Sequence, residues 1–244
     1  MDFVTQALHL VGAGAVAYIT ARNMRDVQTR PNTLASLHLA EAGSVPFLET
    51  LSVRAAAEGD VWLSERLVRH ANDERRHAQI FAHALKQLNK QVIDFKSLPQ
   101  TTAEGTPSER RRSPFFAAYF DRYSQEDLKP ENIDWDVFLA STYILELDAS
   151  RDFVRMANVL PDDEPNSSSL KKGILSVAKD ETDHAAYLRE ALERRMSVTG
   201  ADQVIDIWRT RKVNAMLAMV TFFLQRSGKM PSLVQDGMPV EQVE

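Results

Sequence analysis

Apolar residues recur every three or four positions along most of this chain, a spacing that places them on one face of an α-helix. No stretch alternates apolar and polar residues for long enough to indicate a β-sheet. The pattern therefore predicts an all-α protein. Six helices are expected, over residues 3–28, 33–57, 61–90, 134–160, 168–195 and 201–227, with Asn32 or Thr33 as the N-cap of the second.

The connections between these helices predict how they pair. About three residues join the second helix to the third and about nine join the fourth to the fifth, and links this short make antiparallel neighbours. Some forty residues, 91–133, separate the third helix from the fourth. This stretch is expected to be either a functional insertion or a crossover between the two ends of a bundle. Two helical hairpins joined by one such crossover form a four-helix bundle.

Length and composition indicate one globular domain. The chain has 244 residues, 44% of them apolar and 26% charged, which is enough to bury a sizeable core. We expect a single domain over residues 1–230, its four central helices within 33–195, and a flexible tail over 231–244. The net charge of −5 does not favour nucleic-acid binding.

An apolar run lies near the N-terminus, at residues 7–19. It is too short and too interrupted by polar residues for a transmembrane helix, and no basic residues precede it as they do in a signal peptide. We expect it to form an extra helix packed on the bundle. The protein is therefore expected in the cytoplasm, without a membrane partner.

Cysteine is absent, which excludes disulfides, thiolate metal sites, iron–sulfur clusters and cysteine nucleophiles. Any bound metal must use His, Asp or Glu. One pattern of such residues, Asp-Glu-x-x-His, occurs at 73–77 and again at 180–184, and the sequence has no further Glu-x-x-His. Residues three apart lie on one face of a helix, so the carboxylate and the imidazole of each motif can bind one ion.

Two further glutamates complete a possible metal site. Glu41 precedes Glu74 by 33 residues and Glu146 precedes Glu181 by 35, and each lies among apolar neighbours in the middle of an expected helix. A hairpin with its turn midway brings such residues level with each other. Six ligands result: Glu41, Glu74, His77, Glu146, Glu181 and His184. Oxygen and nitrogen donors without sulfur suit iron or manganese, and two divalent ions would offset four buried carboxylates.

This set of residues resembles the ferritin-like di-iron carboxylate superfamily. The paired Asp-Glu-x-x-His motifs are more similar to its oxygenase and desaturase branch than to storage ferritins. The first motif has the typical arginine before the histidine, Arg76, whereas the second departs from it with Asp183. The resemblance covers about residues 33–195. It implies a ferritin-like four-helix bundle with extra N- and C-terminal helices, and two iron ions, with manganese as the alternative.

The resemblance also implies a role for each motif. It assigns Glu41, Glu74 and His77 to one metal, and Glu146, Glu181 and His184 to the other. The glutamates of the two motifs, Glu74 and Glu181, would bridge the ions. Asp73 and Asp180 would accept hydrogen bonds from the second nitrogens of the ligand histidines and so set their tautomers.

Two residues near Glu146 are candidates for catalysis. Ser150 lies four residues after it, where the resemblance associates a hydroxyl with oxygen activation, although a helix-packing serine is the alternative. Tyr143 lies one turn before it and is either redox-active or a tyrosine of the core. Four residues after His77, where a radical-storing member of the superfamily carries tyrosine, this chain has Phe81, which argues against a stable tyrosyl radical.

Other residues have both a functional and a structural interpretation. His38 and His70 could face the site as additional ligands, but histidines of the core or its rim are the more typical interpretation. Glu49 is a reserve ligand, and Pro46 predicts a kink beside Glu41. The basic run Arg110, Arg111 and Arg112 could bind the phosphate of a carrier protein or of tRNA, or be a solvated loop.

The resemblance implies an oxygen-dependent oxidoreductase, such as a monooxygenase, that hydroxylates, desaturates or cleaves an apolar organic substrate. The substrate would be a small molecule or an acyl chain on a carrier. Electrons would come from an external ferredoxin- or reductase-type donor, because the chain cannot bind an iron–sulfur cluster of its own. A homodimer is possible. The alternatives are a ferroxidase or iron-storage protein, and a non-catalytic bundle that keeps its ligands.

Overall fold

The structure is a computed structural model that describes residues 3–94, 113–164, 166–225 and 232–237. The helices are α1 (Phe3–Arg25), α2 (Arg30–Ala57), α3 (Val61–Gln87), α4 (Pro114–Tyr119), α5 (Trp135–Asn158), α6 (Ser167–Arg195) and α7 (Val198–Gln225), and the strands are β1 (Lys90–Val92) and β2 (Val234–Asp236). The prediction of an all-α class is confirmed. The six expected helices correspond to α1, α2, α3, α5, α6 and α7, and their ends differ from the expected ones by at most three residues.

Polar side chains at the helix starts explain most of these ends. Asp60 accepts a hydrogen bond from the Leu63 N–H and begins α3, and Asp134 accepts from the N–H groups of Asp136 and Val137 and begins α5. The predicted N-cap of α2 is wrong, because this helix begins at Arg30 without a side-chain cap. Asn32 instead accepts a hydrogen bond from the Leu233 N–H at 2.6 Å.

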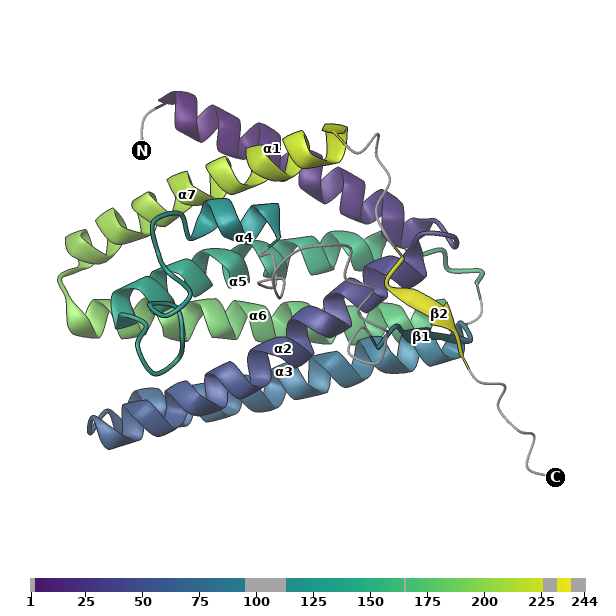
Figure 1. Ribbon diagram of the computed structural model, residues 1–244. Helices are drawn as coiled ribbons and strands as arrows, with labels where there is room; N and C mark the ends of the chain where they lie inside the picture. The colour runs from purple at the N-terminus through teal and green to yellow at the C-terminus, as the bar shows by residue number, and fades with distance from the viewer. Residues whose placement is uncertain (1–2, 95–112, 165, 226–231, 238–244) are drawn as a thin grey trace, which may run out of the picture.

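The central helices form two hairpins, α2 with α3 and α5 with α6, and α3 lies against α6 where the hairpins meet (Figure 1). The helices α1 and α7 pack against each other on the outside of this bundle, and both also contact α5. The apolar run near the N-terminus is thus part of a helix that packs on its neighbours, as expected. Among the described residues, no helix is long and apolar enough to cross a membrane.

The stretch 91–133 contains elements that the sequence pattern does not predict. The short helix α4 begins after Ser113, whose hydroxyl accepts a hydrogen bond from the Phe116 N–H, and it packs against α7. Tyr119, at its end, is fully buried and donates to the carbonyl of Ser141 at 2.8 Å. The arginines at 110–112 lie outside the described residues.

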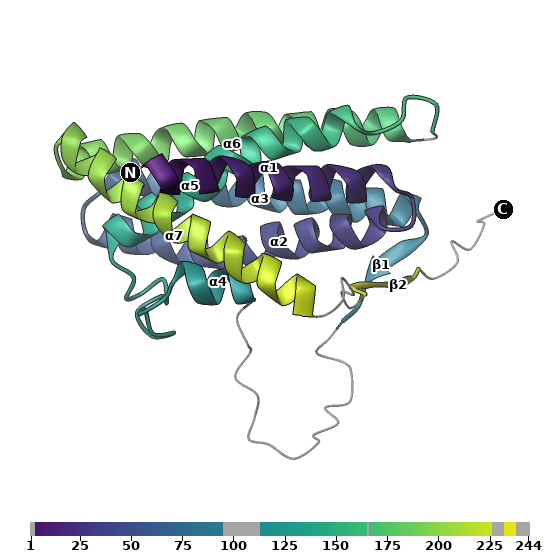
Figure 2. The same ribbon diagram turned by 90° about the horizontal axis from the view of Figure 1, so that it is seen from above.

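A small antiparallel sheet joins the end of α3 to the C-terminal segment (Figure 2). Its strands, β1 and β2, pair with Gln91 opposite Gln235. Each strand has only three residues, which is too few to show an alternation of apolar and polar positions. The sequence pattern therefore predicts neither strand. β2 lies within the stretch 231–244, for which the sequence predicts only a tail, and it is held by its pairing with β1 and by the hydrogen bond from Leu233 to Asn32.

The bundle core consists of two apolar clusters, one toward each end. The first includes Leu51, Leu67, Leu139 and Leu188, and the second includes Leu34, Phe81, Phe153 and Ile174. Each of the four central helices contributes to both clusters. Between the residues that it gives to the two clusters, each helix carries one or two of the acidic and histidine residues predicted as ligands, all of them buried except the half-buried Glu146. The fold therefore holds a layer of ionisable side chains between two apolar layers.

Candidate metal centre

All six predicted ligands come together in this middle layer, and His70 joins them. Two groups of four residues have ligand atoms within 4.8 Å of one another: Glu41, Glu74, His77 and Glu181 form one, and His70, Glu74, Glu146 and His184 form the other. We call them the Glu41 group and the His70 group. Glu74 belongs to both, and the rings of His77 and His184 are 6.0 Å apart. Such clusters of carboxylates and imidazoles could hold metal ions.

In the Glu41 group, three carboxylates surround one nitrogen of His77. Its Nδ1 lies 3.4 Å from Glu41 Oε2, 3.3 Å from Glu181 Oε1 and 3.7 Å from Glu74 Oε1. The ring is fully buried, and Nδ1 forms no hydrogen bond to any described residue. A buried polar atom without a hydrogen bond is costly, whereas a metal ion between it and the carboxylates would satisfy all of them.

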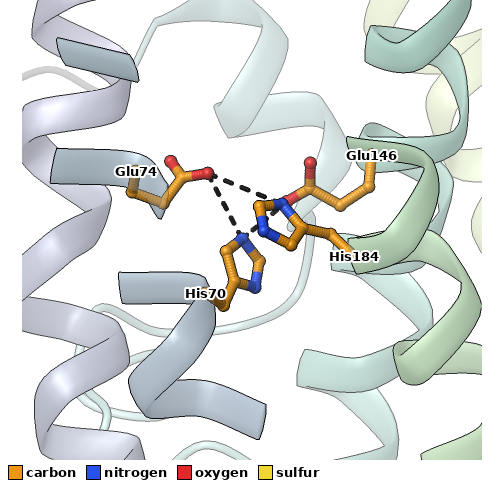
Figure 3. Close-up of side chains that lie close together, drawn as sticks. All are labelled: His70, Glu74, Glu146 and His184. Atoms are coloured by element: carbon orange, nitrogen blue, oxygen red, sulfur yellow. Dashed lines mark ion pairs between the residues drawn. The ribbon is translucent and has the colours of Figure 1, made fainter. Parts of the chain in front are cut away.

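In the His70 group, two imidazoles face two carboxylates (Figure 3). His70 Nε2 lies 3.3 Å from Glu74 Oε1 and 3.4 Å from Glu146 Oε1. The ring of His184 stacks on that of His70 with 3.7 Å between centroids, and its Nδ1 is 3.2 Å from Glu181 Oε2. Glu181 therefore contacts a histidine of each group, as a bridging carboxylate would.

The outer nitrogens of the motif histidines are held by the aspartates of the opposite motif. Asp180 lies 3.1 Å from His77 Nε2, and Asp73 lies 3.4 Å from His184 Nε2. Each imidazole therefore presents Nδ1 to the centre, because a carboxylate accepts the proton on Nε2. The guanidinium of Arg76 donates to both aspartates and joins the two motifs.

Burial and mutual contact shift the pKa values of these groups strongly. Burial raises the pKa of Glu146 to about 8, with a contribution from the nearby Glu181 carboxylate, and burial also raises the pKa of Glu41 well above its usual value. Burial lowers the pKa of His77, but the carboxylates of Glu181, Glu41 and Glu74 outweigh it and raise that pKa to about 12. Without metal ions the centre would therefore hold protons in their place. A donor set of four carboxylates and three imidazoles fits two divalent ions.

Hydrogen bonds identify two further residues at the centre that the sequence analysis does not single out. The hydroxyl of Ser44 lies 2.7 Å from Glu74 Oε2 and 2.6 Å from the carbonyl of Glu41. The hydroxyl of Tyr187 lies 2.7 Å from His70 Nδ1. Each follows a ligand of its own helix by three residues, so the spacing that identifies the motifs could also have found them.

The remaining candidates have other contacts. Ser150 donates to the carbonyl of Leu147 in its own helix at 2.9 Å, and Tyr143 is buried with its hydroxyl beside the Arg189 guanidinium. These contacts account for a packing serine and a core tyrosine, and the catalytic roles of both remain predictions.

Three more side chains with an open interpretation have clear surroundings. Glu49 forms a salt bridge with Arg75 on the surface, away from the ligand groups. His38 donates from Nδ1 to the carbonyl of Ala78 at 2.9 Å, as a histidine at the rim of the core does. Phe81 stacks on Phe153 in the apolar cluster below the ligands. By contrast His70, for which a packing role is the more typical interpretation, lies within a ligand group.

Comparison with protein-family models, with curated proteins and with solved structures finds no match for this chain.

Proposed function

We propose that this chain is a ferritin-like, oxygen-dependent oxidoreductase that binds two iron ions and acts on an apolar organic substrate. One observation carries the proposal: two groups of possible ligands from four helices, all buried except the half-buried Glu146, share Glu74. Manganese can replace iron in such a donor set, since oxygen and nitrogen ligands suit both. Hydroxylation, desaturation and oxidative cleavage are the reactions within this class.

Charge supports two ions in the centre. The four glutamates carry four negative charges when ionised, and two divalent cations offset them without protons. Apolar clusters lie on both sides of the layer, so the ions would be held in a region of low dielectric constant. Electrostatic interactions with a reacting molecule are stronger there than in water.

Bound ferrous ions would supply the electrons that reduce O₂, and the residues of this chain position the ions and exclude water. Asp73 and Asp180 orient two histidines toward the centre. Ser44 holds Oε2 of Glu74, which leaves Oε1 directed at His70 and His77. An external ferredoxin- or reductase-type donor is part of the proposal, because the chain has no cysteine for an iron–sulfur cluster. So are a cytoplasmic location and a small-molecule or carrier-bound acyl substrate.

The test is the fate of iron and oxygen. Protein loaded anaerobically with two ferrous ions per chain should consume O₂ in proportion to the protein and then stop until a chemical reductant is added. Continued oxidation of excess ferrous ion, with growth of a mineral, would instead identify a ferroxidase. Failure to consume O₂ with both ions bound would leave a non-catalytic metal protein and reject the proposal.

A further inference from the structure

We propose that His70 is a seventh ligand and makes the two metal positions unequal. The His70 group then prefers a later transition-metal ion such as Zn²⁺, and the Glu41 group retains a harder ion such as Mn²⁺. This inference rests on the metal centre of the proposed function, although not on its oxygen chemistry. It identifies a selectivity between positions that the six ligands alone would make alike.

The first step is the count of donors in each group. The Glu41 group offers three carboxylates and one imidazole. The His70 group offers two imidazoles together with Glu74, Glu146 and the Glu181 carboxylate that contacts His184. Imidazole nitrogens favour ions such as zinc, copper and nickel, while carboxylates also suit manganese and magnesium. The gain in affinity from Mn²⁺ to Zn²⁺ should therefore be larger at the His70 group.

The second step is that His70 is held in the geometry of a ligand. Its side chain is buried with 2% exposure, and the Tyr187 hydroxyl lies 2.7 Å from Nδ1. Tyr187 is itself buried at 5% and its ring meets that of His70 edge to face. With a metal on Nε2, the proton of the imidazole is on Nδ1 and is donated to the Tyr187 oxygen. Tyr187 is thus a positioning residue for His70.

The third step is the lack of a counterpart in the other half of the bundle. His70 precedes Glu74 by four residues, and the matching position before Glu181 is Val177. Val177 is fully buried in an apolar cluster. The two motifs are otherwise alike, so this one substitution gives the His70 group its second imidazole and leaves the Glu41 group with one.

The experiment uses metal ions alone. Metal-free protein receives one equivalent each of Zn²⁺ and Mn²⁺, and electron paramagnetic resonance reports whether Mn²⁺ is isolated or paired with a second Mn²⁺. The wild type should contain isolated Mn²⁺ only, because Zn²⁺ occupies the His70 group. In His70→Gln the Mn²⁺ pairs should rise toward the statistical share of two equal sites, and the affinity of the tighter Zn²⁺ site should fall by about tenfold or more.

Two further variants make the result specific. Tyr187→Phe removes only the hydroxyl and should shift Zn²⁺ affinity in the same direction by a smaller factor. His83→Gln is the matched control, since His83 lies on the same helix and is exposed. It should behave as the wild type.

Statistical pairing of Mn²⁺ in the wild type would overturn the inference, as would unchanged pairing and Zn²⁺ affinity in both His70→Gln and Tyr187→Phe. If His70→Gln does not fold, Tyr187→Phe alone decides. Oxygen uptake plays no part in this measurement, so equal sites in a protein that consumes O₂ would reject only the selectivity. A selective Zn–Mn pair in a protein that does not consume O₂ would reject only the proposed oxidoreductase.

Discussion

Asp180 of α6 accepts a hydrogen bond at 3.1 Å from Nε2 of His77, which belongs to the motif on α3. The reciprocal contact joins Asp73 of α3 to His184 of α6. Each motif therefore places candidate ligands on its own helix and orients the histidine of the other. This exchange couples the two hairpins at the candidate metal centre, where α3 and α6 meet.

The first prediction follows from this contact. Asp180→Ala removes the acceptor for the His77 Nε2 proton and one partner of Arg76. Metal affinity should fall by about 10–100-fold, the usual cost of losing such a partner. Isothermal titration with Mn²⁺ measures it. Asp183→Ala, an exposed neighbour on the same helix, is the control, and equal affinities in the two variants would contradict the proposed role of Asp180.

The second prediction concerns metal stoichiometry. His184→Ala removes one imidazole from the His70 group, and Glu146→Ala removes one carboxylate from it. Each variant should bind about one ion per chain in place of two, while circular dichroism shows helical content close to that of the wild type. Elemental analysis after gel filtration gives the count. Undiminished iron in both variants would show that these residues are not ligands.

The third prediction is that the metal-free protein loses stability as pH rises. Burial raises the pKa of Glu146 to about 8, above the roughly 4.5 of the unfolded chain, so its contribution is complete at low pH and is lost as pH rises toward 8. The pKa of His77, raised to about 12 by its carboxylates against the effect of burial, acts in the same direction above about pH 6.5.

The free energy of unfolding should therefore fall by about 1.4 kcal/mol per pH unit for each proton released. Thermal unfolding in a chelator between pH 5.5 and 9 measures this. The metal-loaded protein should show a weaker dependence, because ions then occupy the place of the protons. A flat profile for the metal-free protein would mean that these groups are not protonated in the folded state.

Much of the centre is predictable because it depends on local spacing. Glu74 and His77 are one helical turn apart, and the short links place Glu41 and Glu146 level with the motifs. The proximity of the six candidate ligands therefore follows from helix geometry and loop length. The sequence does not decide between the two interpretations of His70. A residue four positions before Glu74 lies on the same face of the helix as Glu74, and that face carries both candidate ligands and residues of the apolar core.

Other features depend on contacts between distant segments. Asparagine is a typical N-cap residue, but the side chain of Asn32 accepts a hydrogen bond from the backbone N–H of Leu233, some two hundred residues away in the sequence. The strands β1 and β2 exist only as a pair, and neither carries a periodic pattern of its own. The contacts between each aspartate and the histidine of the other motif likewise depend on how α3 and α6 are rotated about their axes relative to each other. The hydrophobic spacing within one helix does not specify that rotation.

The last prediction separates two hydroxyls. The resemblance offers Ser150 as a functional serine, with a helix-packing serine as the alternative. In the structure Ser44 lies beside the shared carboxylate, 2.7 Å from Glu74 Oε2, while Ser150 donates to a carbonyl of its own helix. Ser44→Ala should lower metal affinity by roughly tenfold, because a hydrogen bond to a charged group contributes about 1.5–3 kcal/mol. Ser150→Ala should bind metal as the wild type does and, if its predicted role in oxygen activation holds, should change only the rate of reaction with O₂. Stopped-flow absorbance of the iron-loaded variants measures that rate, and the same rate in Ser150→Ala and wild type would make Ser150 a packing residue. Wild-type affinity in Ser44→Ala would mean that a water molecule serves Glu74 equally well.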